Sequence, residues 1–402
     1  MNAEYSLRAR WVLPMEGPAL AGGVVTVEGD RVTNVGLPGP STGRLKDLGD
    51  VVLLPGLVNA HTHLEFSGLP QPLGKPHLAL SDWIRLVIAD RKRSGRDAVS
   101  AIERGLDEGL QLGVTTVGEI ATAPAAAYPA EDLPHLTLFQ EVIGFSRARK
   151  NAVLADVEKR LANCPMAAKV GISPHAPYTV HPQLFEALVD LSAQKNSPIA
   201  VHLAESREEL QLLGEGNGPL RDLLEEKSMW DAEAIPRGSR PVDYLKILAR
   251  APRVLVIHGN FLRTDEIEFI GHHRERMAVV YCPRTHAYFG HAPYPLEKML
   301  SAGVRVALGT DSRASNPDLS LLEELRFVFR QFPRLSPERI LAMGTSAGAS
   351  ALGLSGVAGS IAVGKHASFT AVPCGGNSTD PATAVLQSNR PPNKTWLCGR
   401  EV

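Results

Sequence analysis

Apolar runs of strand length alternate with amphipathic, helix-like stretches along the middle of the chain. Helices are expected at residues 97–112, ended by Gly113, and at 152–163 and 183–194. This alternation predicts an α/β fold, a (β/α)8 TIM barrel. The eight predicted strands are residues 51–60, 115–120, 136–142, 168–173, 198–203, 253–258, 277–282 and 304–309.

Both ends of the chain have a different pattern, with short β-like pieces broken by turns. We expect strands at residues 8–13, 23–28 and 31–35 near the start, and at 368–372 and 395–398 near the end. Two β-rich ends around one α/β middle can pair with each other into a small β-sandwich domain. The predicted division is residues 1–52 and 355–402 for the sandwich and 53–354 for the barrel.

The composition limits the kinds of binding partner to expect, but it does not change the predicted fold. The formal net charge is −1 over 402 residues, so nothing favours a polyanionic partner. No apolar run reaches the ~20 residues of a membrane span, and the first residues lack the pattern of a signal peptide. The four scattered cysteines are typical of reduced thiols in a cytoplasmic protein. We expect a small-molecule substrate, no nucleic-acid or membrane partner, and leave a homodimer open.

Side chains that bind metals or transfer protons follow four of the predicted strands. Active sites of such barrels lie at the carboxyl ends of the strands. Alone, each of these side chains is more often structural, but the same placement after four strands is hard to obtain by chance. They are His61 and His63 after the first strand, His202 and Glu205 after the fifth, His258 after the sixth, and Asp311 after the eighth.

Three imidazoles with one carboxylate suit a divalent transition metal such as Zn²⁺ or Fe²⁺. The candidate ligands are His61, His63, His202 and Asp311. Such an ion lowers the pKa of a water molecule toward neutrality, so hydroxide is available at physiological pH. Glu205 remains free to shuttle protons. The pattern therefore predicts a hydrolytic site.

The motifs that carry these residues resemble those of the amidohydrolase superfamily. The resemblance covers residues 55–63, His202 with Glu205, His258-Gly259 and residues 309–312, and extends over nearly the whole chain. Binuclear members of that superfamily need a bridging Lys or Glu at the end of strand four. Here Lys169 stands at the start of that strand, so the resemblance implies one metal ion and the mononuclear deaminase branch.

The resemblance also implies a role for each residue. His61, His63, His202 and Asp311 would hold the metal ion. His258 would orient or deprotonate the attacking water, and Glu205 would protonate a ring nitrogen of the substrate. Asp311 would take a proton from the attacking water, and this proton would finally leave with ammonia. These are general acid–base steps.

The substrate is less clearly marked. Residues 173–179 are similar to a motif of S-adenosylhomocysteine, methylthioadenosine and aminodeoxyfutalosine deaminases and of triazine chlorohydrolases. That likeness implies that His175 contacts the substrate. Trp83 can stack on a purine or bury a helix face. Arg147 and Arg149 can bind a carboxylate at the far end of the substrate, or lie on the surface.

The segment after strand seven departs from the homocysteine-nucleoside deaminases. Those enzymes have a Ser-Asn pair soon after Cys-Pro, whereas here Arg284, Thr285 and His286 follow. A cationic, histidine-rich rim with Arg284 and His286 would suit an adenosine whose 5′ substituent is anionic or aromatic. Aminodeoxyfutalosine is such a nucleoside, and S-adenosylhomocysteine and methylthioadenosine stay as alternatives.

Three other readings compete with nucleoside deamination. One is hydrolysis of a cyclic amide, and another is dechlorination or deamination of a different amino-heterocycle, namely a triazine, guanine or cytosine. The third is a metal-free relative that serves as a scaffold. A scaffold would have no physical need for Glu205 or His258, so the complete set of groups favours an enzyme.

Overall fold

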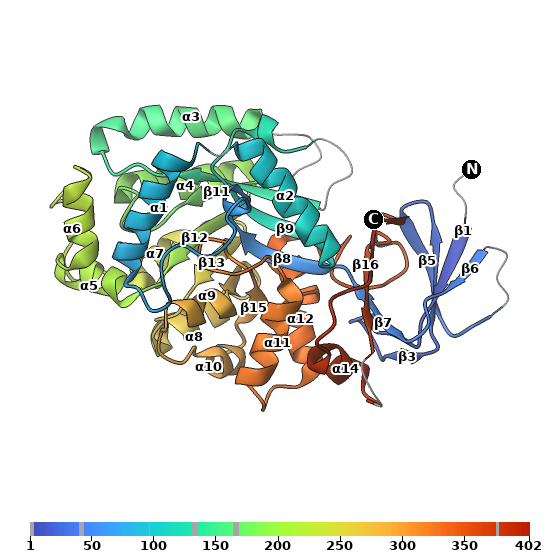
Figure 1. The fold of residues 1–402 in the computed structure, drawn as a ribbon. Helices are drawn as coiled ribbons and strands as arrows, with labels where there is room; N and C mark the ends of the chain where they lie inside the picture. Colours follow the sequence, from blue (N-terminus) through green and yellow to red (C-terminus); the bar gives the residue numbers. More distant parts are fainter. Residues whose placement is uncertain (1–3, 40–43, 96, 130–134, 164–168, 375–377) are drawn as a thin grey trace.

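The computed structural model describes residues 4–39, 44–95, 97–129, 135–163, 169–374 and 378–402. Eight parallel strands form one sheet in the order of the chain, and a bridge joins Thr62, at the end of the first strand, to Asp311, just after the last strand. The predicted (β/α)8 barrel is therefore confirmed (Figure 1). Its strands are β8 (Leu57–Thr62), β9 (Val114–Ala121), β10 (His135–Val142), β11 (Lys169–Pro174), β12 (Ile199–Leu203), β13 (Val254–His258), β14 (Met277–Tyr281) and β15 (Arg305–Leu308).

Helices surround the barrel, and the three expected from the sequence are present as α2, α3 and α4. Asp97 caps α2 by accepting the backbone N–H groups of Val99 and Ser100, which explains where that helix begins. The helices are α1 (Leu80–Ser94), α2 (Ala98–Gln111), α3 (Lys150–Ala162), α4 (Pro182–Lys195), α5 (Arg207–Glu215), α6 (Pro219–Glu226), α7 (Pro241–Leu248), α8 (Thr264–His272), α9 (Pro283–Tyr288), α10 (Leu296–Ser301), α11 (Leu321–Gln331), α12 (Pro337–Met343), α13 (Ser346–Leu352) and α14 (Pro381–Gln387). Short 3₁₀ turns are η1 (Leu64–Phe66), η2 (Ala125–Ala127) and η3 (Arg147–Arg149).

The two chain ends form two further sheets beside the barrel, at the right of Figure 1. Strand β16 pairs antiparallel with β7, so the predicted pairing of the two ends is confirmed. Buried side chains of both sheets, including Val25 of one and Phe369 of the other, share one core. The sheet orders are β5-β4-β1-β6 and β18-β17-β16-β7-β2-β3. Their strands are β1 (Glu4–Arg8), β2 (Trp11–Val12), β3 (Leu20–Ala21), β4 (Val24–Glu28), β5 (Arg31–Gly36), β6 (Arg44–Asp47), β7 (Val51–Pro55), β16 (Phe369–Pro373), β17 (Lys394–Leu397) and β18 (Arg400–Glu401).

The first predicted barrel strand, residues 51–60, is in fact two strands. Gly56 divides them: β7 pairs with β16 in the end sheets, and β8 pairs with β9 in the barrel. A β-carbon at Gly56 would lie 2.0 Å from the hydroxyl of Thr115, so only glycine fits at this crossing. Residues 53–55 therefore lie with the end sheets, while the domain division as a whole stays a prediction.

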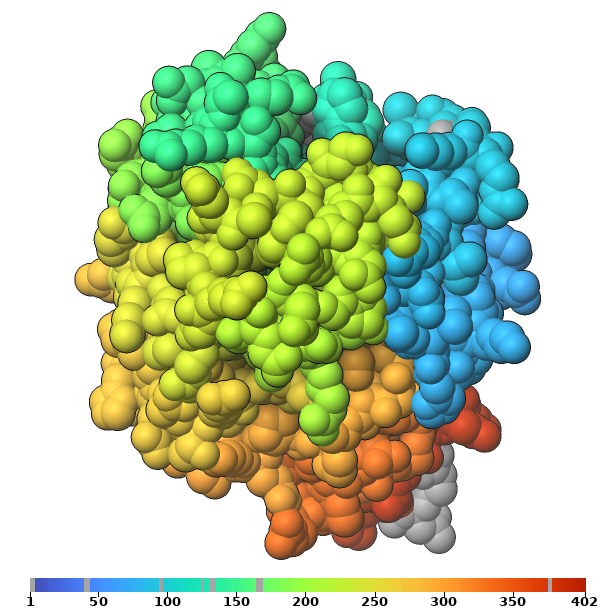
Figure 2. All heavy atoms as spheres, turned by 90° about the vertical axis from the view of Figure 1, so that its left-hand side faces the viewer, coloured from blue at the N-terminus to red at the C-terminus, as the bar shows by residue number. Residues whose placement is uncertain are grey.

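The connection after β8 contains helix α1, which the sequence pattern leaves as a long connection. Helices α1, α5 and α6 lie at the left of Figure 1, at the end of the barrel opposite the end sheets. Figure 2 shows that face, with α5 and α6 across the middle and the blue segment that contains α1 beside them. None of the described helices is both long and apolar enough to cross a membrane.

Candidate active site

Three histidines from two strands meet at the carboxyl end of the barrel. His61 belongs to β8, His63 follows it directly, and His202 belongs to β12. Their candidate donor nitrogens all lie within 4.8 Å of one another, and the three side chains are buried. The structure thus brings together the imidazoles that the sequence predicted as ligands.

Asp311, which follows β15, completes the cluster. Its Oδ1 lies 3.7 Å from Nε2 of His61 and 3.7 Å from Nε2 of His63. Both distances are too long for hydrogen bonds. They are close to the ~3.4 Å that separates a nitrogen from an oxygen on one tetrahedral zinc ion with bond lengths near 2.1 Å. The spacing fits ligands that share an ion better than it fits ion pairs.

The hydrogen bonding of the histidines also fits a metal site. Among the described residues neither ring nitrogen of His61 has a hydrogen-bond partner, although both are buried. Nδ1 of His202 lies 2.9 Å from the backbone oxygen of His175. An N–H there leaves Nε2 with a free lone pair, as in ligating histidines held by a carbonyl. Burial lowers the pKa of His202 well below its usual value, which keeps the ring neutral.

Glu205 and His258 lie beside this cluster, as predicted. Oε1 of Glu205 is 3.5 Å from Nε2 of His258. Burial raises the pKa of Glu205 well above its usual value, and the nearby Asp311 adds to this effect. This shift favours the protonated carboxyl group, which is the form that a general acid requires.

The strand ends that carry these groups have strained backbones. Ala204, His258 and Asp311 have φ values of 54°, 66° and 56°, in the left-handed region that side chains other than glycine rarely adopt. Such strain is held by surrounding contacts and is common at functional sites. One of these contacts is the hydroxyl of Tyr294, which donates to the backbone oxygen of His258 at 2.8 Å.

Two polar residues hold Glu205 in place, and the sequence pattern singles out neither of them. The carboxylate of Glu209 accepts the backbone N–H groups of Ala204 and Glu205, at 2.9 and 2.8 Å. Nδ2 of Asn260 donates to the backbone oxygen of Glu205 at 2.9 Å. The Glu209 side chain is fully buried. A second carboxylate shortly after the predicted acid Glu205 is the sequence signal that could have identified it.

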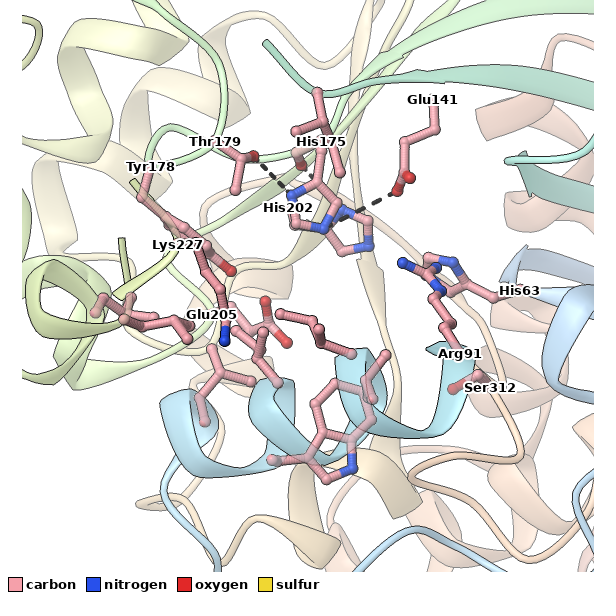
Figure 3. A pocket seen from close by; sticks show the side chains of 18 of the residues that line it. His63, Arg91, Glu141, His175, Tyr178, Thr179, His202, Glu205, Lys227 and Ser312 are labelled. Atoms are coloured by element: carbon pink, nitrogen blue, oxygen red, sulfur yellow. Dashed lines mark hydrogen bonds and ion pairs between the residues drawn. The ribbon is translucent and has the colours of Figure 1, made fainter. Parts of the chain in front are cut away.

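His175 also faces the site, from the loop after β11. Its Nδ1 lies 2.8 Å from the hydroxyl of Thr179, and its Nε2 lies 4.0 Å from Oε1 of Glu141 (Figure 3). Burial raises the pKa of Glu141 to about 7, although the positive charge of Arg91 opposes this. Glu141 stands near the end of β10, so its position at a strand end could have identified it.

A pocket opens above these groups, with α1 and α6 as its walls. Trp83 lines it, and the indole N–H donates to the backbone oxygen of Ala314 at 3.1 Å. Arg91 and Lys227 are the cations among the residues that line it. The lining is His63, Phe66, Leu80, Trp83, Ile84, Val87, Ile88, Arg91, Glu141, Ile143, His175, Tyr178, Thr179, His202, Glu205, Leu220, Leu223, Leu224, Lys227, Met229, His258, Asp311 and Ser312.

Four predicted substrate contacts do not line this pocket. Arg147 and Arg149 form the exposed turn η3. The Arg284 guanidinium is engaged elsewhere, with Asp318 at 2.7 Å and Glu324 at 2.6 Å. The His286 ring is buried and packs edge-on against Tyr281. The expected cationic rim is therefore built into the protein interior or lies outside the pocket.

The amidohydrolase family model matches residues 52–402 of the chain. An aminodeoxyfutalosine deaminase of Deinococcus radiodurans is 32% identical over 362 residues, covering 84% of this chain and 83% of that protein. A 5-methylthioadenosine/S-adenosylhomocysteine deaminase of Moorella thermoacetica is 29% identical over 382 residues, covering 90% and 83%.

Solved structures of the same fold are also similar. A zinc-bound adenosine deaminase from Xanthomonas campestris superposes with a TM-score of 0.81 at 23% identity, covering 99% of this chain and 92% of that one. The chain belongs to the amidohydrolase family and is a hydrolase that acts on carbon–nitrogen bonds.

Proposed function

We propose that this protein is a metal-dependent deaminase of an adenosine that carries a 5′ substituent. The observation that carries the proposal is the position of Glu205 and His258, beside the histidine and aspartate cluster at the inner end of an apolar pocket. The names of the two relatives support the same substrate class, since both act on adenosines altered at the 5′ position.

His61, His63, His202 and Asp311 would hold one divalent ion, Zn²⁺ or Fe²⁺. When bound, the ion supplies Lewis acidity that makes water a nucleophile at neutral pH. The donor set supports this assignment, because it offers imidazole nitrogens and one carboxylate at suitable spacing. The zinc in the Xanthomonas enzyme's crystal structure agrees with that choice.

The chain's own residues would then move the protons. Glu205 gives its proton to a ring nitrogen of the adenine, so negative charge does not build up when water adds to the neighbouring carbon. His258 orients the attacking water through its Nε2. Asp311 accepts a proton from that water and returns it to the leaving amine. As the carbon–nitrogen bond breaks and ammonia leaves, the proton of the added hydroxyl group passes to the Glu205 carboxylate, which restores the acid and leaves an oxo group in place of the amine.

The pocket supports a nucleoside rather than a free base. The Trp83 side chain lines it with the apolar side chains of α1 and offers a flat surface for a purine. Glu141 and His175 lie 4.0 Å apart at the pocket wall and offer hydrogen bonds of the kind that ribose hydroxyls need. A bare guanine, cytosine or triazine would leave this second polar pair unused.

The far side of the pocket suggests the kind of 5′ substituent. Leu220, Leu223 and Leu224 of α6 form an apolar wall, and Lys227 stands at its end. A flat apolar group with a carboxylate matches this arrangement, as in aminodeoxyfutalosine. Lys227 thus takes the place that the sequence pattern gives to Arg284 and His286.

Release of ammonia from a panel of substrates tests the proposal. Metal-loaded protein is given adenosines with different 5′ groups, together with guanine, cytosine, triazines and a cyclic amide. We expect turnover of 5′-substituted adenosines and little from the rest. Ring opening and dechlorination release no ammonia, so loss of each compound is also followed by chromatography. Loss of only a triazine or a ring amide would move the function to that alternative. A protein that binds no metal and turns over nothing would be a scaffold.

The variant Lys227→Ala tests the assignment of the 5′ substituent separately from the deamination reaction. If Lys227 binds a carboxylate, this variant loses kcat/KM for aminodeoxyfutalosine and keeps it for methylthioadenosine, which has no anionic group. Lys195→Ala, at the end of α4 and outside the pocket, is the matched control. Equal losses for both nucleosides would contradict the assignment of the 5′ group while leaving deamination intact.

A further inference from the structure

A second cluster of metal-binding side chains lies away from the active site. His135, His366 and Cys398 each offer a donor atom, and these atoms all lie within 4.8 Å of one another. His135 is the first residue of β10, at the amino end of the barrel, whereas the active site is at the carboxyl end. His366 and Cys398 belong to the end sheets, so the cluster stands where the two parts of the fold meet.

Two distances to Nδ1 of His366 fit a tetrahedral ion. Sγ of Cys398 lies 3.4 Å from Nδ1 of His366, and Oδ2 of Asp30 lies 3.4 Å from the same nitrogen. Tetrahedral zinc with bond lengths near 2.1 Å to nitrogen or oxygen and 2.3 Å to sulfur separates such ligands by about 3.4–3.6 Å. The Asp30 carboxylate has this spacing toward His366 and stands outside the group of three, and because its side chain is half-exposed it can turn toward the other two donors as a fourth ligand.

The His135 ring supplies an independent observation. Its Nε2 is buried and has no hydrogen-bond partner among the described residues. A buried polar atom without a partner costs free energy, so its position calls for a ligand. The ring centres of His135 and His366 are 4.7 Å apart and the planes are tilted by 66°, so the two imidazoles approach without stacking. Burial lowers the pKa of His135 to about 4, which is consistent with a neutral ring.

Backbone contacts hold the donors in place. The N–H of Cys398 donates to the hydroxyl of Ser368, and the N–H of His366 donates to the backbone oxygen of Val357. Asp30 is tied to the same region, because its backbone oxygen accepts the N–H of Ala367. Cys398 has a φ of 48° in the turn between β17 and β18, where Asn or Gly is the usual residue. The donors are thus preorganised.

We propose that His135, His366, Cys398 and Asp30 bind one zinc ion that links the barrel to the end sheets. Two imidazoles, one thiolate and one carboxylate are a donor set that zinc prefers, and the two negative charges balance the ion. Asp30 is half-exposed, which gives the ion a route from solvent. Arg31 lies 3.4 Å from the same Asp30 oxygen, and its ion pair is displaced when the metal binds.

Cobalt substitution distinguishes this site from the active site. Co²⁺ bound to a thiolate has a charge-transfer band in the near ultraviolet, and the active-site donors include no thiolate. We expect this band in cobalt-loaded protein, its loss in Cys398→Ser, and its retention in Cys374→Ser, a buried cysteine of the same sheets. Loaded protein without the band, or a band that persists in Cys398→Ser, would overturn the proposal.

Metal content and thiol protection complete the test. Wild-type protein should bind two zinc ions, and Cys398→Ser and His202→Ala one each. In wild-type protein zinc should slow alkylation of Cys398, followed by mass spectrometry, at least tenfold, so this measurement needs no variant. One ion in both the wild type and Cys398→Ser, with Cys398 alkylated equally fast with and without zinc, would reduce the contact to a thiol–imidazole hydrogen bond.

Discussion

Oε2 of Glu209 lies 2.8 Å from the backbone nitrogen of Glu205. The other carboxylate oxygen accepts the N–H of Ala204, so Glu209 fixes both peptide groups of a turn whose φ at Ala204 is 54°. Glu209 does not line the pocket. It acts through Glu205, as a positioning residue.

Glu209→Gln leaves one side-chain oxygen to accept hydrogen bonds, whereas the two backbone N–H groups of Ala204 and Glu205 use two. We expect kcat to fall about 10–100-fold, as for other residues that orient a functional group, with KM and the active-site metal content retained. Steady-state kinetics and metal analysis on the same sample measure this. Glu215→Gln, an exposed change at the end of α5, is the control. A rise in KM without loss of kcat would show that Glu209 supports binding instead.

Glu205→Gln tests the acid itself. An amide keeps the size of the side chain but cannot donate the proton, so kcat should fall about 10²–10⁴-fold. The metal content should remain, because the assigned ligands are unchanged. Metal analysis is thus as important as the rate. Loss of metal from this variant would identify Glu205 as a ligand.

Whether a feature could be predicted from the sequence depends on whether it is local. Strand ends are local, so the sequence alone places His61, His202 and Asp311 at one end of a barrel. The break at Gly56 was missed because it depends on Thr115 of the next strand, which the pattern along the chain does not contain. The left-handed backbone at His258 follows from tertiary contacts in the same way.

The pocket was harder to predict than the chemistry. The sequence pattern predicts Arg284 as a substrate contact, whereas in the structure its guanidinium pairs with Glu324, forty residues later, which no local pattern shows. Lys227 and Arg91 stand on helices whose position over the barrel is decided by packing. The sequence does not single out Glu209, because its carboxylate binds backbone N–H groups rather than substrate or metal. The parts of the site that depend on contacts between residues far apart in the sequence are therefore the parts that the sequence does not predict.

Because Gly309 has no side chain, its backbone can lie close to His61, a candidate metal ligand. A β-carbon there would lie 2.8 Å from both Cβ and the backbone oxygen of His61, so Gly309→Ala must move β8 or β15. We expect the variant to bind the active-site metal at least tenfold more weakly and to lose about 1–3 kcal/mol of stability. Metal titration and thermal unfolding measure the two effects. Gly214→Ala, where the added carbon meets nothing within 4 Å, is the control.

The Glu141 carboxyl group should control substrate binding through pH. Burial raises its pKa to about 7, so the group is protonated below this pH and a carboxylate above it. Only the carboxylate accepts two charge-assisted hydrogen bonds from ribose hydroxyls. We therefore expect kcat/KM to increase about tenfold as the pH rises through 7, a change of ~1.4 kcal/mol in binding.

Glu141→Gln isolates this effect from other titrations. The variant should match the wild type below pH 6 and lack the rise above pH 7, in a pH profile of kcat/KM. A nucleoside without ribose hydroxyls should show the same flat response with the wild type. An unchanged rise in the variant would assign the pH dependence to another group.

An ion pair joins the two walls of the pocket. The Arg85 side chain of α1 binds both carboxylate oxygens of Glu226 in α6, at 3.0 and 2.6 Å. Both side chains are partly exposed, so water screens the pair, its contribution to stability is small, and it weakens in salt. Since α1 and α6 enclose the substrate, Arg85→Ala should raise KM by up to about fivefold with kcat nearly unchanged.

Salt and a second variant distinguish a closing contact from general stabilisation. KM of the wild type should increase toward that of Arg85→Ala as ionic strength rises, whereas KM of the variant should depend less on salt. Arg250→Ala removes a surface pair with Asp190, and since neither residue lines the pocket, this variant should change neither value. If Arg85→Ala lowered the melting temperature and left KM and its salt dependence unchanged, the pair would stabilise the fold without closing the pocket.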